Sequence, residues 1–240
     1  MTERLSETFG YRSVTPVERE RRIRSVFQAV AGRYDLMNDV MSMGVHRLWK
    51  RDMARRASPR AGEFIVDLAG GTGDIARLMA APDRLVVVCD PSPAMMAVGR
   101  SRCPDSVRFT EGSAESMPFP DASVDLVTIA FGLRNTTDPE AALAEIVRVL
   151  KPGGRFLCLE FSRAWAPIRP FYDAWSFHVI PRLGAWVARE PAAYEYLVES
   201  IRRFPERDDL GQAMRKAGFA RVGWRDYTFG IACLHQGHKS

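Results

Sequence analysis

Between residues 64 and 161, short apolar runs rich in β-branched residues alternate with segments of helical pattern. The runs expected to form strands are Phe64–Ala69, Leu85–Asp90, Val107–Thr110, Val124–Phe131 and Arg155–Phe161. The clearest helix between them is Pro139–Leu150. This alternation predicts a mostly parallel sheet with helices on both faces. Two closing strands, near Arg221–Arg225 and Thr228–His235, complete an α/β fold with a seven-stranded sheet.

A chain of 240 residues is long enough for one α/β domain with additions. Within a single unit 1–240 we expect N-terminal helices over 1–60 and an α/β core over 61–162. An aromatic helical insertion would follow over 163–205, and a closing helix with two strands over 206–240. In the N-terminal part, the first fifteen residues are expected to be frayed and residues 32–39 to form a polar and aromatic break. Helices are expected around Val26, over His46–Ala57 and over Leu210–Ala217.

The sharpest motif, Asp67-Leu68-Ala69-Gly70-Gly71-Thr72-Gly73-Asp74, joins the first predicted strand to a helix. Glycines at such a turn let a ligand approach the backbone. The run from Gly71 also satisfies the GxGxx(G/A) pattern of dinucleotide-binding proteins. Carboxylates on both sides of the glycines, however, would repel a pyrophosphate and attract a cation.

The loop resembles the D-x-G-x-G-x-G pattern of class I S-adenosylmethionine-dependent methyltransferases, with Ala69 in the first glycine position. The resemblance implies a Rossmann-like fold and S-adenosyl-L-methionine as the cofactor, a sulfonium cation with an α-amino group. It places the cofactor on Asp67, Ala69, Gly71, Thr72 and Gly73.

Three later elements occur in the order that this class shows. Asp90 ends the second strand about twenty residues beyond the loop, where a carboxylate accepts hydrogen bonds from ribose hydroxyls. The turn 111–119 matches the one that commonly touches adenine in these enzymes, and the turn 151–156 also recurs among them. Any one of these elements could be a plain turn between strand and helix. Four in this order favour a methyltransferase.

Blocks outside the cofactor loop carry a more specific resemblance. They are Tyr34–Asp39, Met43–Arg51, Phe131–Asp138, Arg189–Leu197 and Ser200–Pro205. Together they resemble the ubiquinone/menaquinone biosynthesis C-methyltransferases over nearly the whole chain beyond the first twenty residues. The resemblance implies methylation of a ring carbon in a polyprenylated quinol, either a demethylmenaquinol or a 2-polyprenyl-6-methoxy-1,4-benzoquinol.

That family contacts its cofactor through positions matching Thr72, Asp90, Ser113, Ala114 and Ala130. Two of these positions depart from the family's usual residues. Ala130 stands where serine is usual, so a hydroxyl contact is missing. Ser113 stands where asparagine or aspartate is commoner, which leaves a shorter side chain for the adenine.

The implied chemistry requires a ring hydroxyl to lose its proton before the ring carbon becomes a good nucleophile. With a phenolic pKa near 10, only about one molecule in a thousand is ionised at pH 7. Arg134 follows the fourth strand and is the first candidate to stabilise the phenolate. The alternative is a structural ion pair of Arg134 with Asp138 or Asp35.

Further candidates lie nearby in the sequence. Asn135 either binds the second ring oxygen or caps the helix that starts near Pro139. Tyr34 either stacks on the ring or relays a proton, or else packs in the core. His46 and His178 have the pKa of a general base but are as a class more often structural. Glu160, at the end of the fifth strand, is a further candidate.

The aromatic stretch 163–205 suits a lid and a groove for the isoprenoid tail. Phe171, Trp175 and Val179 recur at a spacing of four residues. Core packing is the competing explanation for these aromatic side chains. A tail of this kind needs an apolar trough or access to a membrane.

The net charge of +5 permits contact with an anionic surface, although it also fits an ordinary solvated basic surface. The basic helix around Val26 could rest on anionic lipid. Four scattered cysteines and the absence of a signal-peptide or membrane-spanning pattern indicate a cytoplasmic protein, at most peripheral to a membrane. No metal-ligand pattern is visible, and none is expected.

Three other functions are compatible with some of these sequence features. A nicotinamide-dependent oxidoreductase would share the loop and Asp90. A nucleic-acid methyltransferase would share the cofactor half and suit the charge, but the chain has no NPPY-like run and no catalytic cysteine motif, so no nucleic-acid partner is expected. A non-catalytic quinone-binding protein would share the fold.

Overall fold

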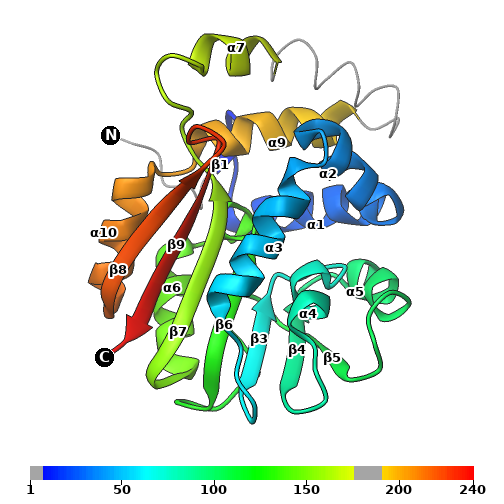
Figure 1. Ribbon diagram of the computed structural model, residues 1–240. Coiled ribbons are helices and arrows are strands. Elements are labelled where there is room, and N and C mark those ends of the chain that lie inside the picture. Colours follow the sequence, from blue (N-terminus) through cyan, green and yellow to red (C-terminus); the bar gives the residue numbers. More distant parts are fainter. Residues whose placement is uncertain (1–7, 176–190) are drawn as a thin grey trace.

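The computed structural model describes residues 8–175 and 191–240, except for the side chains of residues 30, 33–35, 40, 41 and 191–195. Within this part, seven strands form one sheet in the order β5-β4-β3-β6-β7-β9-β8 (Figure 1). β9 is antiparallel to both of its neighbours, and the other pairings are parallel. The strands are β3 (Phe64–Leu68), β4 (Leu85–Asp90), β5 (Val107–Glu111), β6 (Val124–Ala130), β7 (Leu150–Phe161), β8 (Phe219–Tyr227) and β9 (Ala232–Lys239). The predicted α/β fold with a mostly parallel, seven-stranded sheet is confirmed.

Helices cover both faces of the sheet (Figure 1). One face carries α3 (Val45–Ala57), α4 (Asp74–Met79) and α5 (Pro93–Arg100), and the other carries α6 (Pro139–Val149) and α10 (Arg207–Ala217). Successive side chains of a strand point to opposite faces. In β7, Phe156 and Cys158 therefore join one buried cluster while Leu157 and Leu159 join the other. Burial on both faces explains why the strands read as continuous apolar runs.

A further layer lies beyond the carboxyl ends of the parallel strands (Figure 1). It contains a short hairpin of β1 (Thr8–Phe9) and β2 (Arg12–Ser13), followed by α1 (Pro16–Val30), the short turn η2 (Ala31–Arg33) and α2 (Tyr34–Ser42). From the insertion come α7 (Arg169–Ala174) and α9 (Pro191–Arg203). The turn η3 (Leu133–Asn135) follows β6. This layer covers the sheet edge where open α/β folds bind ligands.

Two expectations for the N-terminal part were wrong. Residues 8–13 form the β1–β2 hairpin rather than a frayed segment, and Glu199 of α9 accepts a hydrogen bond from the Tyr11 amide at 3.0 Å. Residues 34–39 lie in α2 rather than in a break. Leu36, Met37, Val40 and Met41 recur at helical spacing in α2, and Met37 is 4% exposed, so burial stabilises a short amphipathic helix that the polar residues around it concealed.

The closing strands differ from the prediction in their bounds. β8 is longer than predicted, β9 has the predicted length but starts four residues later, and a turn over residues 228–231 joins them. Thr228 and Phe229 adopt the left-handed conformation in that turn, with φ of 45° and 57°. Of the helices in residues 8–175 and 191–240, none combines the length and the hydropathy that crossing a bilayer requires.

Candidate active site

Two neighbouring cavities open at the carboxyl edge of the sheet. The first, of about 460 Å³, is lined by the loops that follow β3, β4, β5 and β6 and by residues of α1. The second, of about 570 Å³, lies among residues of α2, α3, α7 and α9. Phe131 lines both cavities, so the two cavities adjoin at this residue.

The glycine loop begins the first cavity and has the conformation that its sequence predicts. Gly71 and Gly73 have φ of 51° and 75°, in the left-handed region that favours glycine. A Cβ at Gly73 would lie 2.5 Å from the Cys103 sulfur, so this position admits no side chain. Ala69 has a φ of 48°, which explains why related loops carry glycine there. The departure at Ala69 therefore leaves the shape of the loop intact.

Two buried carboxylates face this loop. Asp67 accepts hydrogen bonds from the Thr128 hydroxyl at 2.9 Å and from a backbone amide of α4, and burial raises its pKa to about 7. Asp90 accepts the amides of Gly71 at 2.9 Å and Ser92 at 2.8 Å, and burial raises its pKa to about 6. Carboxylates held in this way favour a cation and hydroxyl donors over a phosphate.

The structure brings the predicted cofactor residues together. The first cavity is lined by Asp67, Ala69, Gly71, Thr72, Asp90, Ser113, Ala114 and Ala130. Gly73 does not line it and instead precedes α4 as its N-cap residue. These residues come from the ends of four neighbouring strands, which is why spacing in the sequence could place them at one edge.

α1 closes this cavity, which the sequence did not predict. Ile23 and Phe27 line it from above the loop. Arg19, 2% exposed, holds the helix in place: it donates to the Thr8 carbonyl at 2.8 Å, to the Arg134 carbonyl at 3.0 Å, and to the carbonyl of Thr136. The sequence shows an arginine in an amphipathic helix. It does not show that this arginine is buried, or that it binds carbonyls more than a hundred residues away.

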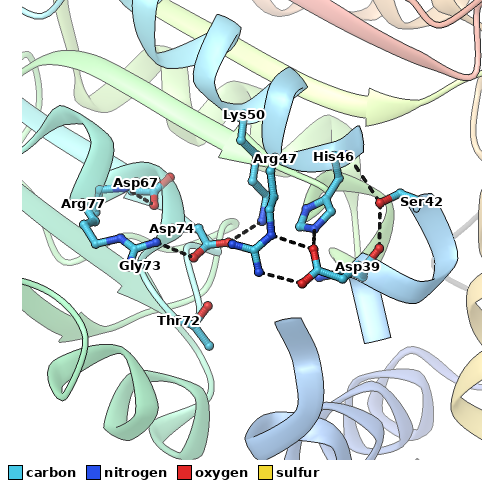
Figure 2. Close-up of polar contacts among 12 residues, drawn as sticks. Asp39, Ser42, His46, Arg47, Lys50, Asp67, Thr72, Gly73, Asp74 and Arg77 are labelled. Atoms are coloured by element: carbon cyan, nitrogen blue, oxygen red, sulfur yellow. Dashed lines mark hydrogen bonds and ion pairs between the residues drawn. The ribbon is translucent and has the colours of Figure 1, made fainter. Parts of the chain in front are cut away.

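His46 lines the second cavity and is 2% exposed. Its Nε2 lies 2.9 Å from the Asp39 carboxylate, which also accepts two hydrogen bonds from Arg47 (Figure 2). Its Nδ1 is buried and has no hydrogen-bond partner among the described residues. Burial, followed by the charge of Lys50, lowers the pKa of His46, while Asp39 opposes the shift. The lowered pKa of His46 favours the neutral imidazole. Its Nε2 is held by Asp39, and its Nδ1 has no hydrogen-bond partner among the described residues.

Arg134 occupies a different position from the one predicted for a phenolate ligand. Its side chain is 4% exposed, lines neither cavity, and pairs with Glu160 at 2.8 Å. The same guanidinium donates to the Phe131 carbonyl at 2.7 Å. The sequence suggested Asp138 or Asp35 as the partner; the structure pairs Arg134 with Glu160, Asp138 caps α6, and the side chain of Asp35 is outside the described part of the chain. The pair joins the ends of β6 and β7 and so holds the turn that carries Phe131.

Asn135 lines the first cavity. Its side-chain amide donates to the Phe131 carbonyl at 3.2 Å, and its Oδ1 accepts the Tyr196 hydroxyl at 3.0 Å. Asp138 rather than Asn135 caps α6, because Asp138 accepts the amides of Glu140 and Ala141. Tyr34 begins α2, but its side chain is outside the described part of the chain.

The aromatic insertion contributes to the second cavity. Phe171, Tyr172 and Trp175 line it, and Phe171 is also 77% exposed. His178 and Val179 lie outside the described residues. Among residues 8–175 and 191–240, no group of three or more His, Cys, Asp or Glu side chains is arranged to hold a metal ion.

Comparison of the chain with known proteins identifies its family. The pattern of the ubiE/COQ5 methyltransferase family matches residues 15–239. The chain belongs to that family. It is 61% identical to a ubiquinone/menaquinone biosynthesis C-methyltransferase UbiE of Rubrivivax gelatinosus, over 98% of this chain and 94% of that one. It is 50% identical to the protein of the same name from Acidiphilium cryptum, with both chains covered completely.

Solved structures agree on the fold. A SAM-dependent methyltransferase of Thermotoga maritima, described as a possible histamine N-methyltransferase, superposes with a TM-score of 0.67. It is 22% identical and covers 91% of this chain and 100% of its own. By its family the chain is an S-adenosylmethionine-dependent methyltransferase, and the first cavity, hereafter the cofactor cavity, is lined by the residues predicted to bind that cofactor. The buried carboxylates and the left-handed glycine loop fit a sulfonium cofactor.

Proposed function

We propose that this methyltransferase transfers a methyl group to a ring carbon of a polyprenylated quinol, as the names of its relatives indicate. The observation that carries the proposal is the pair of cavities that meet at Phe131. Bound S-adenosylmethionine supplies an electrophilic methyl group. An acceptor ring in the second cavity, hereafter the acceptor cavity, would then meet the methyl group beside Phe131, where the two cavities adjoin.

The lining of the acceptor cavity suits an aromatic ring with a hydrocarbon tail. Most of its side chains are aromatic or aliphatic, among them Trp49, Phe161, Ile168, Val198, Ile201 and Ile231. Apolar surface that is removed from water stabilises a complex by about 25 cal/mol per Å². A volume of about 570 Å³ accommodates a ring and the first isoprene units.

The rim of the acceptor cavity offers an exit for the rest of the tail. Met43 and Phe171 line the cavity and are 73% and 77% exposed. Exposed side chains at the mouth of an apolar cavity suit contact with a lipid surface. We infer that the enzyme works peripherally at a membrane, with the tail leaving between α2 and α7.

His46 is our candidate for the base that removes the ring hydroxyl proton. The Asp39 carboxylate is an acceptor for Nε2–H, which fixes the tautomer and leaves Nδ1 as the basic nitrogen; Nδ1 is buried in this structure, so the imidazole must shift to reach the hydroxyl of a bound acceptor. A lowered pKa keeps the imidazole neutral at pH 7, as a base requires. Arg134 acts as a positioning residue in this scheme, because its pairing with Glu160 holds Phe131 where the two cavities adjoin.

The test is transfer of labelled methyl from S-adenosylmethionine to two reduced acceptors, a demethylmenaquinol and a demethylated ubiquinol precursor. We expect label on a ring carbon of at least one, and the ratio of the two identifies the physiological ring. Each acceptor is also tested without its prenyl tail, which should raise KM. Absence of label on either quinol, with cofactor binding intact, would refute the proposal.

The base is tested with His46→Asn against a matched control, His238→Asn. His238 lies on β9 and lines neither cavity. We expect kcat of the His46 variant to fall by about 100-fold, since general bases contribute roughly 10²–10⁴. The His238 variant should retain full activity. A His46 variant with unchanged kcat would show that another group takes the proton.

A further inference from the structure

Lys50 lies on α3 and lines the cofactor cavity. It is 6% exposed, and its Nζ lies 3.0 Å from the Asp74 carboxylate (Figure 2). A buried lysine costs free energy unless its charge is compensated. In the described part of the chain, Asp74 is the ion-pair partner of Lys50, and the Asp74 side chain is itself 19% exposed. This pair uses only one of the three N–H donors of the Lys50 ammonium.

Acidic side chains dominate the described lining of the cofactor cavity. They are Glu20, Asp67, Asp74, Asp90, Glu115 and Asp138. The basic side chains in that lining are Arg24 and Lys50. Arg24 belongs to α1, is 46% exposed and pairs with Glu20 at 2.8 Å. Within the described lining, Lys50 is therefore the buried cation.

The cofactor carries charges of both signs. Its sulfonium and α-ammonium groups suit the acidic lining, but its α-carboxylate would be repelled by six acids. A carboxylate taken out of water needs a cation and hydrogen-bond donors. Lys50 offers both, beside Asp67 and Asp74 at the start of α4.

We propose that the Lys50 ammonium binds the α-carboxylate of the cofactor's methionine portion, with Asp74 holding the ammonium in place. The methionine portion then lies at the Lys50–Asp74 side of the cavity, and the ribose lies at Asp90. Asp67 and Asp74 are left to face the α-ammonium group. The assignment depends on the cofactor and is independent of which acceptor the enzyme methylates.

The experiment compares two ligands that differ only in the carboxylate. S-Adenosylmethionine and decarboxylated S-adenosylmethionine are titrated calorimetrically into the wild type and into Lys50→Met. Wild type should prefer the carboxylated ligand. In the variant, Kd for S-adenosylmethionine should rise at least 30-fold, Kd for the decarboxylated ligand should change less than 3-fold, and the preference should disappear.

Arg51→Met is the matched control, since Arg51 is exposed on the same helix. It should leave both affinities unchanged. Lys50→Gln is made alongside, because it keeps a hydrogen-bond donor for Asp74 should Lys50→Met fold poorly. It should show the same loss of ligand preference. Equal weakening for both ligands, or a retained preference in either Lys50 variant, would overturn the proposal.

Discussion

His46 and Lys50 lie one turn apart on α3 and line different cavities, His46 the acceptor cavity and Lys50 the cofactor cavity. The positive charge of Lys50 is one cause of the lowered pKa of His46. α3 therefore carries the proposed base and the proposed cofactor ligand on one rigid element. Its core residues Trp49 and Met53 pack against the sheet and fix the position of both.

The pH profile of Asp39→Asn tests the proposed base. His46 must be neutral to act, so kcat should fall as pH drops through its lowered pKa and stay level above it. The charged groups that act on His46 are Asp39 of α2, Asp74 of α4 and Lys50 of its own helix. Asp39 raises the pKa of His46, so its removal should shift the acidic limb to lower pH. It should also reduce kcat at pH 8, because the tautomer is no longer held.

Asp52→Asn is the control for this profile. Asp52 is also paired with arginines, Arg55 and Arg56, but lines neither cavity. Its profile should match the wild type. If the acidic limb of the Asp39→Asn profile lies at the same pH as in the wild type, Asp39 does not influence the ionisation of His46.

The Arg134–Glu160 pair provides a second prediction. Loss of one partner of a buried pair leaves the other charge unpaired, which costs about 3–5 kcal/mol. Arg134→Met and Glu160→Met should each lower the free energy of unfolding by that order, measured by denaturant titration. The double variant should be more stable than either single one, because no unpaired charge remains.

Methyl transfer by the same double variant separates two roles for Arg134. A positioning residue can be replaced together with its partner, so we expect kcat within about tenfold of wild type. A loss comparable to that of the base, about 100-fold or more, would instead assign Arg134 to the phenolate.

The positions of the parallel strands along the chain and the cofactor loop could be predicted because both depend on local sequence. β-Branched runs mark buried parallel strands, and the loop residues that bind the cofactor follow the ends of those strands. Because Asp67 and Asp90 each stand at the carboxyl end of such a run, the sequence alone places both at one edge of the sheet.

Pairings between distant residues could not be predicted. Arg134 meets Glu160 because β6 and β7 pair in a particular register, with Ala130 opposite Leu159. Lys50 meets Asp74 only once α3 packs on α4. Each depends on tertiary contacts that leave no periodic pattern in the sequence.

Cofactor affinity should increase with pH between about 5 and 8. The pKa of Asp67 is raised to about 7 and that of Asp90 to about 6, mainly by burial. A raised carboxyl pKa in the folded state means that free-enzyme stability declines as pH rises from about 4 to 7. A cationic ligand favours the ionised form of both carboxyl groups. Lys50 and Asp74 are the other charged groups that act on Asp67.

Binding should therefore release protons near pH 6, and Kd should be about tenfold higher at pH 6 than at pH 8. Calorimetry in two buffers of different ionisation enthalpy measures the protons released. Asp67→Asn should bind more weakly and release fewer protons. Binding without proton release at pH 6 would contradict ionisation of Asp67 on binding.

Arg19 is predicted to hold α1 over the cofactor cavity. Arg19→Met removes the donor to three backbone carbonyls, and each buried acceptor left unsatisfied costs about 1–3 kcal/mol. We expect the free energy of unfolding to fall by about 2 kcal/mol or more and the cofactor Kd to rise about tenfold, because Ile23 and Phe27 line the cavity. Arg19→Lys should rescue little, since one ammonium cannot reproduce the fork of a guanidinium.

Hydrogen exchange distinguishes a local effect from a global one. If Arg19 clamps α1, amides of Pro16–Val30 should exchange faster in Arg19→Met while those of β3 and β6 keep their protection. Arg21→Met, an exposed change on the same helix, should alter neither exchange nor affinity. Faster exchange throughout the sheet, or unchanged cofactor affinity, would show that Arg19 stabilises the fold without shaping the cofactor cavity.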